Sequence, residues 1–246
     1  IYTLSLHDAL PIWSAKRAFI SLFFFAALAS AVVGQNASDW FITRWVAPAS
    51  GTIVFPASFY SGYTLKYEPI NPVTGIATGA AITISGATSG QLINGLTPGT
   101  TYKIYAFGTG LKELDFSSYS DTSKKAIVAI EQWGTTKWSS LEEAFYECEN
   151  MDVTATGVPD LSACQNVGRM FYGCTSLVNS NGSISGWNTQ NIKNMEQMFS
   201  GATSFNQPLN NWNTAKVTDM GSMFFGATSF DQPADQIGRA SCRERV

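Results

Sequence analysis

Apolar residues recur at fixed spacing in the second half of the chain and divide it into four similar segments. Each segment carries one phenylalanine, and these lie about 25–28 residues apart, at Phe145, Phe171, Phe199 and Phe224. In the third segment Ile192, Met195 and Met198 stand seven, four and one positions before Phe199. The other segments repeat this spacing, which predicts a short helix with one apolar stripe.

The polar positions of the segments support the same prediction. Residues typical of a helix N-cap stand five positions before each phenylalanine: Ser140, Asn166, Asn194 and Asp219. Glycine stands two positions after it in three segments, where a helix would end in the left-handed conformation: Gly173, Gly201 and Gly226. We name the segments repeats 1 to 4: Trp133–Met151, Pro159–Leu177, Trp187–Phe205 and Trp212–Phe230. A capped helix followed by a short strand, such as Phe205–Trp212, predicts an α/β solenoid.

The first half of the chain follows a different pattern. Short runs rich in β-branched and aromatic residues alternate with turn clusters, at Trp40–Trp45, Thr52–Phe55, Tyr63–Tyr67, Ala81–Ser85, Gln91–Ile93 and Thr101–Phe107. Strands of this number and length predict an immunoglobulin-like or fibronectin-III-like β-sandwich over residues 35–127. The stretch Leu96–Tyr102 resembles the end of a fibronectin type III module. Residues 124–130 are expected to lead as a strand into the repeats, which occupy 128–235.

The repeats resemble a known family. The run 170–177, MFYGCTSL, looks like the BspA-type leucine-rich repeat of bacterial surface proteins, and the run 198–207, MFSGATSFNQ, is similar to its variant in Bacteroidetes and mycoplasma. The resemblance implies a leucine-rich-repeat fold and a secreted or surface-attached bacterial protein that adheres to host matrix proteins or glycans. It carries over no catalytic residue.

The two ends of the chain indicate a processed fragment. Residues 1–12 and 236–246 back-translate to opposite strands of one sequencing-adapter oligonucleotide, so we interpret both as adapter-derived and the native protein as truncated. Residues 13–34 combine Lys16 and Arg17 with the apolar run Ala18–Val33 and small residues near its end, which predicts a secretory signal peptide. A membrane anchor is the alternative. The run is shorter than the ~20 residues of a spanning helix, so no membrane span is expected after cleavage.

The charge of the chain and the positions of its cysteines limit the partners and the bonds that can be expected. The net charge is −3 and no cluster of basic residues follows the leader, so nucleic acid is not an expected partner. Cys148, Cys164 and Cys174 fall at repeat positions that hold Ala, Ile or Val in other repeats, which indicates small buried side chains. A disulfide between Cys148 and Cys174 on adjacent repeats is the alternative.

The residues for common catalytic sites are missing. The single histidine, His7, lies in the adapter-derived end, so His-based catalysis and His-ligated metal sites are excluded for the remaining chain. The acidic pair Glu142 and Glu143 is typical of a solvated surface rather than of a glycosidase site. Trp133 and Trp138 pack in a core or, alternatively, stack on sugars. We therefore expect no enzyme activity, no cofactor and no metal.

The sequence predicts a secreted or cell-surface protein that binds an extracellular protein or glycan. The residues favoured for partner binding are the amides of the piece between repeats 3 and 4: Asn206, Gln207, Asn210 and Asn211. The alternative is a non-catalytic carbohydrate-binding or structural surface module of a longer secreted protein. A weak self-association is also expected at the C-terminal repeat, whose Met220, Met223 and Phe224 have no following repeat to cover them.

Overall fold

The computed structural model describes residues 36–58 and 62–233. From Ser38 onward these residues belong to one compact unit. The predicted adapter-derived ends and the predicted signal peptide lie outside the described residues. Within those two described ranges, every helix is too short or too polar to cross a membrane.

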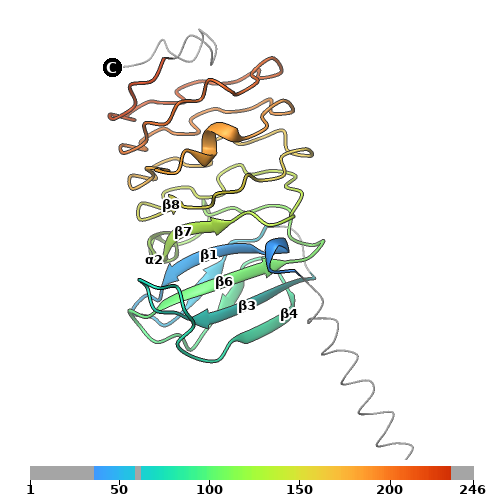
Figure 1. Cartoon of the computed structure of the whole chain (residues 1–246), viewed down its shortest axis with the longest axis vertical. Helices are drawn as coiled ribbons and strands as arrows, with labels where there is room; N and C mark the ends of the chain where they lie inside the picture. Colours follow the sequence, from blue (N-terminus) through green and yellow to red (C-terminus); the bar gives the residue numbers. More distant parts are fainter. Residues whose placement is uncertain (1–35, 59–61, 234–246) are drawn as a thin grey trace, which may run out of the picture. The chain divides into compact units, whose positions relative to one another are not determined.

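Short strands dominate the described secondary structure (Figure 1). The strands are β1 (Phe41–Val46), β2 (Ile53–Phe55), β3 (Tyr63–Pro69), β4 (Ile82–Ala87), β5 (Gln91–Ile93), β6 (Thr101–Phe107), β7 (Ile127–Gln132) and β8 (Asp152–Val153). The helical pieces are η1 (Ala37–Asp39), α2 (Asp121–Ala126) and η2 (Ser183–Gly186).

The main sheet has six strands in the order β4-β3-β6-β1-β7-β8. All neighbouring pairs are antiparallel except β7 and β8, which are parallel. Buried and half-exposed residues alternate along β1, β3 and β6, because successive side chains of a strand point to opposite faces. The predicted half-buried strand at Thr101–Phe107 is confirmed as β6.

The predicted β-sandwich is wrong. One mixed sheet holds six strands, and the other sheet is the two-stranded pair β2–β5. The strand expected at residues 124–130 is confirmed from Ile127 onward as β7, whereas residues 124–126 belong to α2. β7 also pairs with β1, through Arg44 and Ala129. The segment directly after repeat 1 adds β8, where Val153 is the partner of Ile130. The sheet therefore continues from the first half of the chain into the repeats (Figure 1).

The predicted α/β leucine-rich-repeat solenoid is also wrong. The segments expected as helices are successive turns, at 142–147, 168–173, 196–201 and 221–226, and the piece 205–212 is not a strand. In repeat 3, Gln197 has φ +53° and Gly201 has φ +72°. An α-helix requires φ near −63° at every position, so two left-handed residues within five positions prevent it. The other repeats have the same two left-handed positions, and repeat 1 places Glu147 where the others have glycine.

Backbone hydrogen bonds between neighbouring repeats replace those of a helix. In repeat 2, the amides of Val167, Arg169, Phe171 and Gly173 donate to carbonyls of repeat 3 at 2.8–3.0 Å. The amides of Met170, Tyr172 and Cys174 donate three residues back within their own repeat. Alternate amides thus bond within the repeat and between repeats, which satisfies the backbone without a helix.

The apolar columns pack as one continuous core. Phe145, Phe171, Phe199 and Phe224 stack with ring centroids 5.7–5.8 Å apart. This core extends without interruption from the sheet, at residues such as Phe41 and Trp45, to Phe230 in repeat 4. Trp133 and Trp138 are fully buried, which confirms core packing and rules out sugar stacking on their rings.

Candidate functional site

The four amides predicted to bind a partner lie in the loop between repeats 3 and 4, and two of them make bonds to neighbouring repeats. The Oδ1 atom of Asn206 accepts hydrogen bonds from the backbone amide of Asp231 at 3.0 Å and from Nε2 of Gln232 at 2.9 Å. The Nε2 atom of Gln207 donates to the carbonyl of Val178, at 3.0 Å. Asn206 and Gln207 therefore link repeats across the loop.

The same kind of link joins the loops that follow repeats 1 and 2. The Oδ1 atom of Asp152 accepts from the backbone amides of Val178 at 3.0 Å and Asn179 at 2.7 Å. Asn179 is fully buried, and its Nδ2 donates to the carbonyl of Val153 at 2.9 Å. Such bonds supply the polar partners that buried backbone groups require. Polar residues at these loop positions thus hold the repeats in register.

Asn210 and Asn211 differ from the other two amides. They occupy the tip of a turn that closes when the amide of Trp212 donates to the carbonyl of Leu209 at 3.0 Å. Both asparagines are exposed, and neither side chain makes a hydrogen bond to another described residue. Leu209 and Trp212 are buried on either side, and Nε1 of Trp212 donates to the carbonyl of Ile184 at 3.0 Å. The turn is therefore anchored at both ends while its two amides face solvent.

Another turn of the same form precedes repeat 3. The amide of Trp187 donates to the carbonyl of Ile184 at 3.2 Å, with Ser185 and Gly186 between them. Ser185 uses its hydroxyl internally, donating to the carbonyl of Gly182 at 2.7 Å. This earlier turn presents less side-chain hydrogen-bonding capacity than the Asn210–Asn211 turn.

The turn segments of the repeats carry paired charges. Arg169 lies 3.3 Å from Glu143 in repeat 1 and 3.5 Å from Glu196 in repeat 3, and its Nε donates to Gln197 at 2.8 Å. The hydrogen bond to Glu143 raises the pKa of Arg169, so this side chain stays charged. Since both acids are partly exposed, the pairs contribute little to stability.

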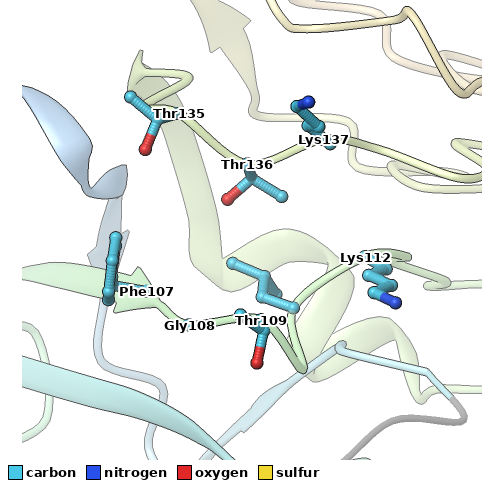
Figure 2. A pocket seen from close by; sticks show the side chains of 8 residues that line it. Phe107, Gly108, Thr109, Lys112, Thr135, Thr136 and Lys137 are labelled. Atoms are coloured by element: carbon cyan, nitrogen blue, oxygen red, sulfur yellow. The ribbon is translucent and has the colours of Figure 1, made fainter.

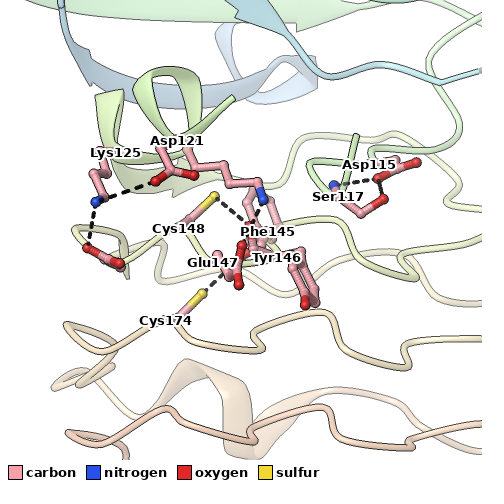
Figure 3. Close-up of polar contacts among 11 residues, drawn as sticks. Asp115, Ser117, Asp121, Lys125, Phe145, Tyr146, Glu147, Cys148 and Cys174 are labelled. Atoms are coloured by element: carbon pink, nitrogen blue, oxygen red, sulfur yellow. Dashed lines mark hydrogen bonds and ion pairs between the residues drawn. The ribbon is translucent and has the colours of Figure 1, made fainter. Parts of the chain in front are cut away.

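Charged and aromatic side chains also gather where α2 meets the turn segment of repeat 1 (Figure 3). Lys124 of α2 is buried, with its Nζ 2.8 Å from Glu147 and 5.0 Å above the ring of Tyr146. The Tyr146 ring stacks on that of Tyr172, with centroids 4.8 Å apart. Because these side chains bond to and stack on one another, they belong to the packing between α2 and the repeats.

The three described cysteines are free, buried thiols. The Sγ atom of Cys174 donates to the carbonyl of Phe145 at 3.0 Å (Figure 3). Burial raises the pKa of the Cys164 thiol to about 11 and raises the pKa values of Cys148 and Cys174 well above the ordinary value. The structure therefore favours small apolar side chains over the alternative disulfide between Cys148 and Cys174.

Across residues 36–58 and 62–233, no three His, Cys, Asp or Glu side chains are grouped to hold a metal ion. Sequence reasoning missed the structural role of the loop amides, although a signal for it was present. An acid or amide follows the large apolar residue of three repeats: Met151-Asp152, Phe205-Asn206 and Phe230-Asp231.

The family described as "Mycoplasma protein of unknown function, DUF285" matches residues 116–243. The match includes α2, β7 and all four repeats. No curated protein and no solved structure matches the chain.

Proposed function

The chain belongs to the DUF285 family, and from this premise we propose that it is a non-catalytic recognition protein of the bacterial surface or extracellular space. It binds an extracellular protein or glycan, in the manner of the BspA-type surface proteins that its repeats resemble. The observation that carries this proposal is the pair of exposed amides, Asn210 and Asn211, at the tip of an anchored turn.

The chemistry of the turn suits such ligands. An asparagine side chain offers two donors and a carbonyl acceptor, which match both sugar hydroxyls and peptide groups. Because Leu209 and Trp212 hold the turn from within the core, little conformational freedom is lost when a ligand binds. Asn206 and Gln207 support the site indirectly, since their side chains fix the loop to neighbouring repeats.

Binding of the full chain to immobilised fibronectin and mucin tests the proposal by biolayer interferometry. The double variant Asn210→Lys/Asn211→Lys should weaken binding at least about fivefold, because two side-chain amides and their hydrogen bonds are lost at about 0.5–1.5 kcal/mol each. Its melting temperature should stay close to that of the parent, because both positions are exposed. Gln190→Lys, at another exposed position of the repeats, is the matched control and should bind like the parent.

A third variant separates the two roles of the loop amides. Gln207→Ala removes the bond to Val178 and should lower stability by about 1 kcal/mol while leaving the contact made by Asn210 and Asn211 in place. Failure of the parent to bind either surface, or unchanged binding by the double variant, would refute the proposal.

A further inference from the structure

One edge of the main sheet is open. Strand β4 is the last strand on that side, and among residues 36–58 and 62–233 it pairs with β3 and with no other strand (Figure 1). The opposite edge differs, because β8 lies there and the repeats continue from it. An edge strand directs part of its backbone amides and carbonyls away from the sheet, so these groups are free to pair with a further strand.

The open edge lacks the features that normally prevent such pairing. Natural edge strands are protected by charged side chains, by proline or by a β-bulge. The sequence of β4, ITISGA, contains neither a charged residue nor a proline. Its pairing with β3 is regular from Ile82 to Ile84, and the register shifts only beyond Ile84. The first half of β4 is therefore a regular strand with an unprotected edge.

The surroundings of β4 are also uncharged. The segment from Pro69 to Tyr102, which contains β4 and β5, has no charged residue. The turn before β4 exposes Val73 and Ile76. It lies at the end of β3, where the amide of Thr78 donates to the carbonyl of Pro69 at 2.8 Å. The whole chain has a net charge of −3, so an uncharged edge lets a second copy approach without repulsion between like charges at the contact.

The apolar layer of the sheet reaches this edge and is uncovered there. Ile82 and Ile84 lie opposite Tyr67 and Leu65 of β3, and both of these β3 residues are buried. Residues directly opposite each other in an antiparallel pair share a face of the sheet, so the two isoleucines lie on its core side. Ile82 is nevertheless 53% exposed. Another strand beside β4 would cover it.

We propose that a second copy of the chain covers this edge, with the β4 strands of the two copies paired antiparallel about a two-fold axis. An axis perpendicular to the sheet keeps the isoleucines of both copies on the core side. When Thr83 lies opposite Thr83 of the second copy, Ile82 of each copy lies opposite Ile84 of the other. Apolar pairs and threonine pairs are both favourable across strands. A shift by one residue would turn the isoleucines of the two copies to opposite faces.

Sedimentation velocity of the full chain over a concentration series tests the proposal and should show a reversible monomer–dimer equilibrium. Thr83→Lys should raise the dissociation constant of the dimer at least about tenfold, because like charges would face each other across the axis. Ile82→Lys should also raise it at least about tenfold, because it places a charge beside the apolar Ile84 of the other copy. An equimolar mixture of Thr83→Lys and Thr83→Glu should dimerise again, because opposite charges then meet at the axis.

Two control variants carry the same charge elsewhere. Leu92→Lys is the matched control, because Leu92 is 50% exposed and lies on β5 of the other sheet. Phe225→Lys changes an exposed residue of repeat 4, where self-association was predicted from the sequence. Both should dimerise like the parent, and melting curves establish that every variant is folded. Hydrogen exchange locates the contact, since the amides of β4 should exchange more slowly as the parent is concentrated, and those of β5 should not change.

Four results would overturn the proposal. A parent that is monomeric at every concentration excludes a second copy and leaves an extended peptide of another protein as the occupant of the edge. Unchanged dimerisation of folded Thr83→Lys and Ile82→Lys excludes β4 as the contact. A mixture of Thr83→Lys and Thr83→Glu that stays monomeric contradicts the register. A dimer that Phe225→Lys disrupts, while both β4 variants leave it intact, forms through repeat 4 instead.

Discussion

Replacing Phe199 by alanine is the sharpest test of how the repeats are held together. Phe199 is fully buried in the phenylalanine stack between Phe171 and Phe224. Its ring also packs on those of Phe205 and Trp212, with centroids 4.2 Å and 6.1 Å away. The substitution therefore removes one ring from contact with four others.

The expected cost follows from burial and from how little the cavity can close. Truncating a buried phenylalanine costs about 3–5 kcal/mol, and an aromatic pair adds about 0.5–1.5 kcal/mol beyond its buried area. The amide of Phe199 donates to the carbonyl of Met223 at 2.9 Å, and that of Phe171 to Met198 at 2.9 Å. These bonds fix the spacing of the repeats, so we expect about 4–5 kcal/mol. Domains are stable by about 5–15 kcal/mol, which makes this a large fraction.

Urea unfolding followed by circular dichroism measures the effect. With an m value of about 2–3 kcal/mol/M, the urea midpoint should fall by roughly 1.3–2.5 M. Phe225→Ala is the matched control, because its side chain is 54% exposed and stacks on no described ring, and it should cost at most about 1 kcal/mol. Equal losses for Phe199→Ala and Phe225→Ala would refute the assignment of the stack as the core.

Two further predictions concern the turn backbone and the thiols. Gly201→Ala should lower the free energy of unfolding in urea by about 1–2 kcal/mol, because Gly201 has φ +72°. The cost is conformational rather than steric, since the nearest atom to the new Cβ, Cα of Gly173, lies 3.5 Å away. Gly186→Ala is the control, because Gly186 has no positive φ and should tolerate alanine; a larger loss for Gly186→Ala than for Gly201→Ala would contradict the turn geometry. Cys148, Cys164 and Cys174 should resist iodoacetamide at pH 8 in the native protein and react in denaturant, as read by peptide mass spectrometry, because burial raises their pKa values and suppresses the thiolate. Native alkylation, or a Cys148–Cys174 disulfide in the oxidised protein, would show that these thiols are accessible to reagent or to each other.

The repeat columns were predictable from the sequence because burial is a property of single positions. Every phenylalanine of the predicted column is buried, and the small column of Cys148, Cys174, Ala202 and Ala227 is buried beside it. The polar column was also located correctly, since Asn194 accepts from the amide of Glu196 at 2.8 Å. These polar residues were predicted to cap a helix, but their side chains bond to the backbone of a turn instead.

The spacing of apolar residues alone could not distinguish the observed turns from a short helix. Apolar residues seven, four and one positions before each phenylalanine would lie with it on one side of a helix. The same spacing also places them on one side of two successive turns. The distinction lies in the left-handed residues Arg169, Gln197 and Ser222, none of which is glycine. Their conformation is supported by bonds to the next repeat, such as Gln197 to Gly221 at 2.9 Å. Such long-range bonds override local propensity.

The order of the strands in the sheet has the same long-range origin. β1 and β7 are far apart in sequence, and their strands show which faces are buried but not which strand is the neighbour. Phe107 and Thr136 line the same cavity because β6 and β7 flank β1 in the sheet (Figure 2). Neither residue belongs to a recognisable motif, so their proximity could not be predicted from the sequence.

The backbone pattern of the repeats limits where the proposed recognition site can lie. In repeats 1 to 3, alternate amides of the turn segment bond to the next repeat, and the apolar columns fill the core, so neither is available to a ligand. The loop residues Asn206 and Gln207 are occupied in the same way by links between repeats. Asn210 and Asn211 remain outside all three sets. A substitution at their turn changes the surface without touching register or core, which is the property that a recognition site needs if its specificity is to vary while the fold is kept.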